Sequence, residues 1–201
     1  MTDKSILTEL HDHQRVLGQT ISESGQLVHR IADAICVCFD GGHKVLLCGN
    51  GGSAADAQHV AAEFVNRFRN ERRGLPALAL TTDTSVLTSI GNDSSFSEVF
   101  SRQVEALANA GDVLIGISTS GRSANVLAAL KTARALGVIT VGLTGEGGRE
   151  TMAPLCDECV VVLSADTART QECHAFLLHV LCGIVEARLL DAKARSGGGA
   201  R

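Results

Sequence analysis

The stretch Val45-Leu-Leu-Cys-Gly-Asn-Gly-Gly-Ser53 decides the fold class. Its first four residues form a short apolar run, which is typical of a strand that is buried on both faces. The glycines and the asparagine that follow predict a tight loop, and residues 54–68 then predict a helix. A buried strand, a polar loop and a helix in this order form the unit from which parallel α/β sheets are built.

The same unit recurs further along the chain. Residues 112–118 form a second apolar run, which leads into a Ser- and Gly-rich loop and a predicted helix at 124–136. The remaining predicted elements are strands at 78–80, 137–143 and 159–163 and a last helix at 171–193. Apolar strands that alternate with helices predict an α/β fold, a three-layer sandwich with a five-stranded, doubly wound parallel sheet.

A long amphipathic helix is predicted ahead of the first strand, over residues 3–39. Apolar side chains recur there every three to four residues, and Gly41-Gly42 ends the pattern. Such a stripe packs either on the domain or on the same helix of a second chain. We expect residues 1–195 to form one domain in which 1–40 serve oligomerisation, and residues 196–201 to be a disordered tail.

Composition limits the possible functions. The 201 residues carry a net charge of −4, which lacks the basic footprint of a protein that binds nucleic acid directly. We see no signal peptide and no apolar run long enough to span a membrane, so we expect a cytoplasmic protein with free thiols. Cys156 and Cys159 form a CxxC motif, whose alternative uses are metal binding and redox chemistry.

Two polar loops, 49–53 and 118–123, follow predicted strands and open helices. Ligands of such sheets bind beyond the carboxyl ends of the strands. Glycines let the backbone approach a ligand, and N–H groups at a helix start attract anions. Neither loop has the GK[ST] or GxGxxG pattern of nucleotide sites. The loops therefore predict a phosphate cradle, with simple helix caps as the alternative.

Polar side chains interrupt two of the predicted helices. His59 and Glu63 are four residues apart and share one helix face, and His179 stands between Leu178 and Val180. Two histidines, a glutamate and possibly a glutamine can ligate a divalent metal such as Zn²⁺. The alternatives are a surface i,i+4 pair on the first helix and a hydrogen-bonded buried histidine on the second.

Five segments together resemble a known family. They are residues 48–53, 56–63, 91–93, 111–121 and 169–174. Their order and spacing resemble the phosphoheptose isomerases, which are sugar-isomerase (SIS) domain proteins. The likeness covers nearly the whole chain.

The resemblance implies an enzyme that converts sedoheptulose 7-phosphate to D-glycero-D-manno-heptose 7-phosphate through an enediol, for heptose biosynthesis. It also implies a homotetramer with active sites between subunits and one zinc ion per subunit. The metal ligands carried over by motif are His59, Glu63, Gln171 and His179. The contacts to the sugar phosphate carried over by motif are Asn50, Gly51, Gly52, Ser53, Arg67, Asn92, Asp93, Ser118, Thr119, Ser120, Ser123 and Gln171.

The reaction moves a proton between adjacent carbons, so it needs a base, an acid and stabilisation of an oxyanion. We assign Glu63 as the base and His179 as the acid. Gln171 and His179 are separated by roughly 12 Å along one straight helix, so their two long side chains could just reach one metal ion. A neighbouring subunit that supplies one group would ease this constraint.

A second hypothesis comes from relatives of the same family that are not isomerases. Those relatives bind the DnaA replication initiator, and residues 66–68 and 81–88 resemble them. They lack the residues that match Glu63 and His179, and both are present here. The isomerase hypothesis is therefore favoured, with the initiator-binding protein and a sugar-phosphate sensor as alternatives.

Overall fold

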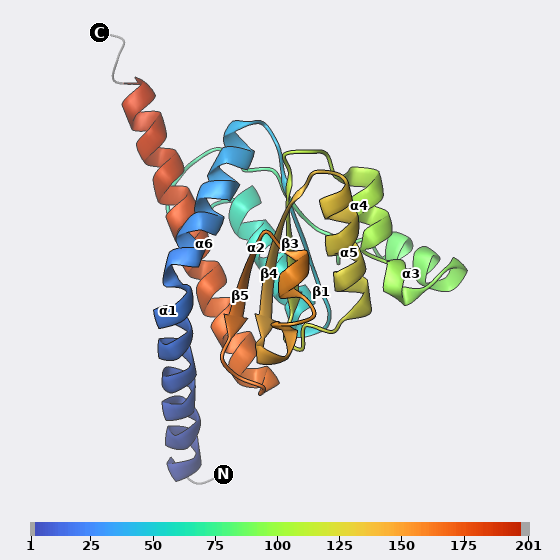
Figure 1. Cartoon of the computed structure of the whole chain (residues 1–201). Coiled ribbons are helices and arrows are strands. Elements are labelled where there is room, and N and C mark those ends of the chain that lie inside the picture. The colour runs from blue at the N-terminus through green and yellow to red at the C-terminus, as the bar shows by residue number, and fades with distance from the viewer. Residues whose placement is uncertain (1–2, 198–201) are drawn as a thin grey trace.

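Five parallel strands form the middle layer of the computed structural model, which describes residues 3–197 (Figure 1). They are β1 (Val45–Gly49), β2 (Ala77–Ala79), β3 (Val113–Ser118), β4 (Ile139–Gly145) and β5 (Glu158–Val162). Their order in the sheet is β2-β1-β3-β4-β5, and Leu47 of β1 aligns with Ala79 of β2 and Ile115 of β3. The predicted fold class is confirmed.

Six helices surround the sheet: α1 (Asp3–Asp40), α2 (Gly52–Val65), α3 (Thr84–Asp93), α4 (Ser101–Leu107), α5 (Ala124–Ala135) and α6 (Thr167–Gly197). The sequence did not predict α3 and α4. Helix α2 ends at Val65 rather than at residue 68, because the following segment bonds to α6. Helix α6 includes the first two residues of the predicted tail, and residues 198–201 lie outside the described residues.

Side chains of the strands alternate between two cores. Leu47 and Ile115 face the core formed with α1, α2 and α6, whereas Leu46 and Leu114 face the core formed with α4 and α5. The strands are apolar throughout because both of their faces are covered. Each core therefore fixes the position of the helices on its own side of the sheet.

The strand order reverses between β1 and β3. The chain leaves β1 into α2 on one face, and it leaves β3 into α5 on the other face. A crevice forms at such a reversal, at the carboxyl edge of the sheet, and ligands of doubly wound folds bind there. The two loops predicted to bind phosphate lie at this point.

Helix α6 is apolar and, over Thr167–Ala194, long enough by length and composition to cross a membrane. This corrects our expectation that the chain has no such run. However, 44% of its most apolar window is buried inside the fold, where it packs against α1 and α2. The helix also buries Arg169 and Glu186, which both have ionic partners. Helix α6 is therefore packed as a core helix.

Helix α1 runs beside α6, and its first half extends beyond the rest of the domain (Figure 1). Ile31 and Ile35 in its second half are buried in the core. Ile6, Leu7 and Leu10 in its first half are each about half exposed. This apolar surface is the one that we expected to serve oligomerisation, and the assembly itself stays a prediction.

Candidate active site

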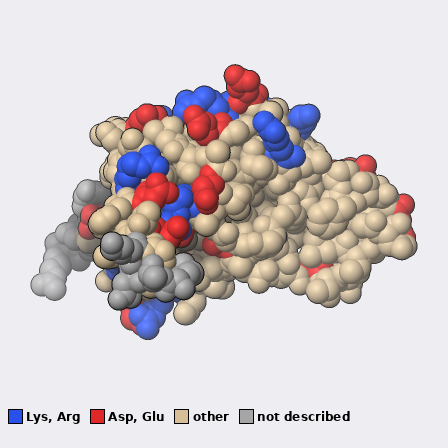
Figure 2. Space-filling model, turned by 90° about the horizontal axis from the view of Figure 1, so that it is seen from below, with Lys and Arg blue, Asp and Glu red and all other residues tan. Residues whose placement is uncertain are grey.

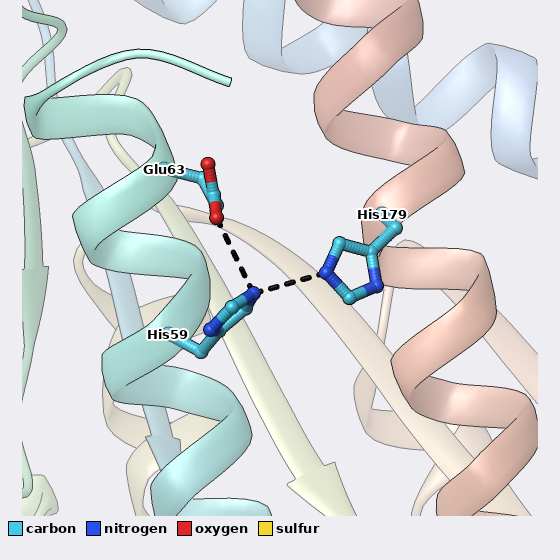
Figure 3. Close-up of side chains that lie close together, drawn as sticks. All are labelled: His59, Glu63 and His179. Carbon is cyan, nitrogen blue, oxygen red and sulfur yellow. Dashed lines mark hydrogen bonds and ion pairs between the residues drawn. The ribbon is translucent and has the colours of Figure 1, made fainter. Parts of the chain in front are cut away.

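Three of the predicted site residues come together between α2 and α6. His59 and Glu63 project from α2 toward His179 of α6 (Figure 3). The Nε2 atoms of the two histidines are 2.9 Å apart, and His59 Nε2 lies 3.3 Å from Glu63 Oε1. The ligand atoms of all three residues lie within 4.8 Å of one another. The fold thus unites residues that stand 120 positions apart in the sequence.

A backbone contact orients the ring of His179. Its Nδ1 lies 2.9 Å from the carbonyl oxygen of Ala175, one helical turn earlier, so Nδ1–H donates to that carbonyl. In the neutral ring Nε2 is then unprotonated and faces His59. Metal-binding histidines are held in the same way, with one nitrogen donating to a fixed acceptor and the other aimed at the ion.

The geometry of the cluster fits a divalent metal ion. Zinc binds histidine nitrogens at about 2.0–2.1 Å, so two such ligands of a tetrahedral ion stand roughly 3.3 Å apart. The observed separation of 2.9 Å needs only a small opening of the two rings. Among the described residues this is the one group of three or more His, Cys, Asp or Glu side chains with such spacing.

The cluster is open to solvent on one side. The side chain of His59 is 53% exposed and that of Glu63 is 21% exposed. The ring of Phe68 packs beside His179 with its centroid 5.9 Å away, and a hollow continues from there along α6 past Gly183. A sugar or a second subunit can therefore approach the three side chains directly.

Gln171 lies beside the loop that follows β1. Its amide occupies the space that a Cβ of residue 52 would need, so a side chain at Gly52 would displace the Gln171 amide from this position. Its amide is also directed at Asp56, one turn before His59 on α2. Burial raises the pKa of the Asp56 carboxyl, an effect that the Gln171 contact opposes. Gln171 thus links the loop to the helix that carries His59, and its role as a metal ligand stays a prediction.

The two loops at the strand ends are tied together by a pair of asparagines. The amide of Asn50 donates to Asn125 Oδ1 at 2.8 Å, and the amide of Asn125 donates to Asn50 Oδ1 at 2.9 Å. Asn125 was missed in the sequence because nothing local distinguishes it from any other polar residue in the first turn of a helix. Its role depends on a partner 75 residues away.

The hydroxyl-rich loop after β3 is not used to cap its helix. Ser123 is the N-cap residue of α5, yet its side chain makes no capping bond, and its Oγ lies 2.9 Å from the Oγ of buried Ser118. Gly51 opens α2 without any side-chain cap. The alternative that these side chains only cap the two helices is therefore not supported.

The edge of the sheet where the strands end is largely uncharged. Figure 2 views the molecule from this side and shows a broad, mostly uncharged surface across its middle and right, with Lys and Arg on its upper rim and a few scattered Asp and Glu. Neutral donors such as hydroxyls and helix N–H groups can bind a phosphate dianion there. Thr119 is half-buried and Ser120 is exposed, so both are accessible to a ligand.

Two predicted contacts, Asn92 and Asp93, are not brought to this cluster within one chain. Asn92 and Asp93 lie at the end of α3, on the opposite side of the molecule from α6 (Figure 1), and they bond to each other at 2.8 Å. The guanidinium of Arg67 pairs with Glu71 at 3.1 Å on the surface. The assigned substrate contacts of all three residues stay predictions.

His174 is fully buried near the end of β4, where its ring approaches the backbone of Thr144 without reaching good hydrogen-bond geometry, a contact that only partly opposes the effect of burial. Burial lowers the pKa of His174 from 6.5 to about 4. The unfolded chain therefore takes up a proton below about pH 6.5, while the native chain does not until about pH 4. The contribution of His174 to the free energy of unfolding is therefore fully present above pH 6.5 and is lost as the pH falls toward 4.

We expect the free energy of unfolding to fall by about 3 kcal/mol over this range on account of His174. Urea unfolding at pH 7 and pH 4.5 measures the change. The variant His174→Gln, which does not titrate, should lose much less stability between the two values than the native chain. An equal loss in both proteins would contradict the assignment.

Comparison with known proteins shows the family of this chain. The model of the SIS domain matches residues 10–145. The phosphoheptose isomerase of Burkholderia pseudomallei is 54% identical over 183 residues, which cover 90% of this chain and 92% of the relative. Phosphoheptose isomerase 1 of Campylobacter jejuni is 53% identical over 178 residues, which cover 89% of this chain and 95% of the relative.

Solved structures give the same result. The phosphoheptose isomerase of Neisseria gonorrhoeae superposes with a TM-score of 0.85 at 42% identity, covering 92% of this chain and 98% of that one. The enzyme from Francisella tularensis superposes with a TM-score of 0.86 at 36% identity and the same coverage. The fold and the match to the family model thus define a SIS-domain protein. Within that class, the chain belongs to the phosphoheptose isomerase family.

Proposed function

We propose that this chain is an aldose–ketose isomerase that converts sedoheptulose 7-phosphate to D-glycero-D-manno-heptose 7-phosphate in heptose biosynthesis. The observation that carries the proposal is the cluster of His59, Glu63 and His179 on two helices of a phosphoheptose isomerase fold. The same residues speak against the initiator-binding alternative, whose members lack the matching acid and histidine.

The reaction takes a proton from one carbon of the sugar and returns it to the neighbouring carbon. We assign the carboxylate of Glu63 to this transfer and the ring of His179 to protonation of the sugar oxygens, a role that requires a proton on His179 Nε2 and therefore a state in which this nitrogen does not hold the metal. His59, Glu63, His179 and the nearby Gln171 would hold a zinc ion, which when bound supplies Lewis-acid stabilisation of the developing oxyanion. The open side of the cluster gives the sugar access to Glu63.

The phosphate group is assigned to the loops after β1 and β3. Ser53, Ser118, Thr119, Ser120 and Ser123 supply hydroxyls there, and the first turns of α2 and α5 supply N–H groups. The Asn50–Asn125 pair holds the two loops at a fixed separation. A dianion is thereby bound without a lysine.

The double variant Ser120→Ala/Ser123→Ala should raise KM for the sugar phosphate by roughly 10- to 100-fold, since two hydrogen bonds to a charged group are lost. Inorganic phosphate should inhibit the native enzyme and should inhibit the variant much less. Ser101→Ala, at the start of α4, is the matched control. If both KM and phosphate inhibition are unchanged in the double variant, the anion site lies at residues 50–53 instead.

We further propose a cytoplasmic homotetramer with one zinc ion per subunit and with active sites completed across subunits. Support comes from the exposed apolar side chains of Ile6, Leu7 and Leu10 and from the exposed position of His59. The placement of Asn92 and Asp93 on the far side of the chain also favours a site that a second subunit completes.

Incubation of the metal-loaded protein with sedoheptulose 7-phosphate tests the function. NMR should show conversion to the aldose phosphate, with incorporation of solvent deuterium at the carbons that exchange a proton. Fructose 6-phosphate serves as the control substrate. An absence of turnover by folded, metal-loaded protein would refute the proposed function.

A further inference from the structure

Glu186 of α6 is buried and binds a whole segment of backbone. Its carboxylate accepts N–H bonds from Phe68 at 3.0 Å, Arg69 at 2.9 Å and Asn70 at 2.9 Å, and a further bond from the Asn70 amide at 3.0 Å. Although burial raises the pKa of Glu186, these bonds hold it below its ordinary value. Glu186 is therefore a charged anchor for the segment that follows α2.

Arg72 completes the same network from the other side. Its guanidinium lies 3.2 Å from Glu186, and the two side chains are only 6% and 2% exposed. It donates to the carbonyl oxygens of Glu63 at 2.7 Å and Phe64 at 2.8 Å, which belong to the last turn of α2. The Arg72–Glu186 pair therefore joins α6 to the end of α2 that carries Glu63.

The Arg72–Glu186 pair lies between the same two helices as the metal cluster. Glu186 follows His179 by seven residues, two helical turns or about 10 Å, so both project from the same face of α6. On the α2 side Arg72 bonds to the backbone of Glu63 itself. Phe68, whose N–H is held by Glu186, packs its ring beside that of His179.

We propose that Arg72 and Glu186 are positioning residues, which set the separation of α2 and α6 and thereby place Glu63 and His179 for metal binding and catalysis. The proposal rests on the function proposed above. A buried ion pair contributes little net stability compared with apolar residues of the same size. The pair instead bonds to the backbone of Glu63, which is a predicted metal ligand, and to the backbone of Phe68, which packs beside His179. Such contacts fix the distance between the two helices that carry the ligands.

The test uses Arg72→Lys and Glu186→Asp. Both variants keep the charge, but lysine has one ammonium group in place of the several N–H donors of arginine, and aspartate is one methylene shorter than glutamate. Cobalt(II) replaces the native ion as a probe, because its visible spectrum reports coordination geometry. We expect each variant to bind Co²⁺ about 10- to 100-fold more weakly, as for the loss of other supporting contacts around a metal. The spectrum should change shape, and kcat should fall while KM stays within about threefold.

Asp33→Asn is the matched control, since it removes a 2.8 Å ion pair between α1 and Arg188 of α6, two residues from Glu186. It should leave the Co²⁺ spectrum and affinity unchanged. Folded Arg72→Lys and Glu186→Asp proteins with native spectrum, affinity and kcat would overturn the proposal.

If the single variants fail to fold, Glu186→Gln is the second variant, because it keeps an acceptor oxygen for the N–H groups of Arg69 and Asn70 while it removes the charge that pairs with Arg72. We expect that protein to show an altered Co²⁺ spectrum, and a native spectrum would overturn the proposal. Failure of the proposed function has a different signature. The native chain would then bind Co²⁺ with a well-defined spectrum but would not turn over the heptulose phosphate.

Discussion

The variant Glu63→Gln should fold normally and lose about 10³-fold or more in kcat. A general base contributes typically 10²- to 10⁴-fold to such a reaction, and a carboxamide cannot accept the proton. Glu63 is placed for this role by its position on α2, one turn from His59, and its side chain is partly exposed, at 21%. Steady-state kinetics with sedoheptulose 7-phosphate measures the loss.

Glu105→Gln is the matched control, because Glu105 is an exposed acid on α4 that pairs with Arg102. It should retain native kcat. Activity of Glu63→Gln within about threefold of the native enzyme, a change in barrier below about 1 kcal/mol, would exclude Glu63 from catalysis. A carboxylate bound to zinc is a weaker base, so the metal content of Glu63→Gln is informative. Retained metal with lost activity identifies a base, and loss of both identifies a ligand.

The variant His59→Ala should lose its bound metal and with it most of its activity. His59 supplies one of the three ligand atoms that lie within 4.8 Å of one another, and its removal leaves one histidine and one carboxylate. Loss of a direct ligand should weaken metal binding by more than the 10- to 100-fold that is typical of an outer-shell contact. Competition with a chelator of known affinity gives the change.

His11→Ala provides the control, since His11 is exposed on α1. Its metal content should equal that of the native chain. Native protein that is purified without chelator, contains no divalent metal and is fully active would refute the metal assignment. The phosphate assignment would be unaffected by that result, because the loops after β1 and β3 are separate from the cluster.

The sheet could be predicted because each of its strands can be recognised from its own short stretch of sequence. The apolar runs around Leu46 and Ile115 are bounded by glycine and polar residues, and both faces of the sheet are covered. Helix α3 could not be predicted from its own sequence, since Thr84, Ser85 and Val86 have low helix propensity. It forms because Asp83 accepts the N–H of Val86 and so caps the first turn.

The site was partly predictable for a similar reason. His59 and Glu63 share a helix face at a spacing that the sequence displays directly. Their union with His179 needed the resemblance to a family, because no local rule relates residues 120 positions apart. The contacts of Arg72 with Glu186 were invisible for the same physical reason. An arginine among polar neighbours and a glutamate in an apolar helix become a pair only when α6 packs beside α2.

The position of α6 in the sequence also sets an order for the maturation of the protein. All five strands and α2 precede α6 along the chain, so during synthesis His59 and Glu63 emerge long before His179. Domains form as units from the N-terminal side during translation, at about 5–20 residues per second. The complete metal cluster can therefore exist only after the ribosome has released α6. Because α6 also covers one face of the sheet, that side of the core and the metal cluster are completed together, and metal depletion should therefore yield a folded but inactive pool.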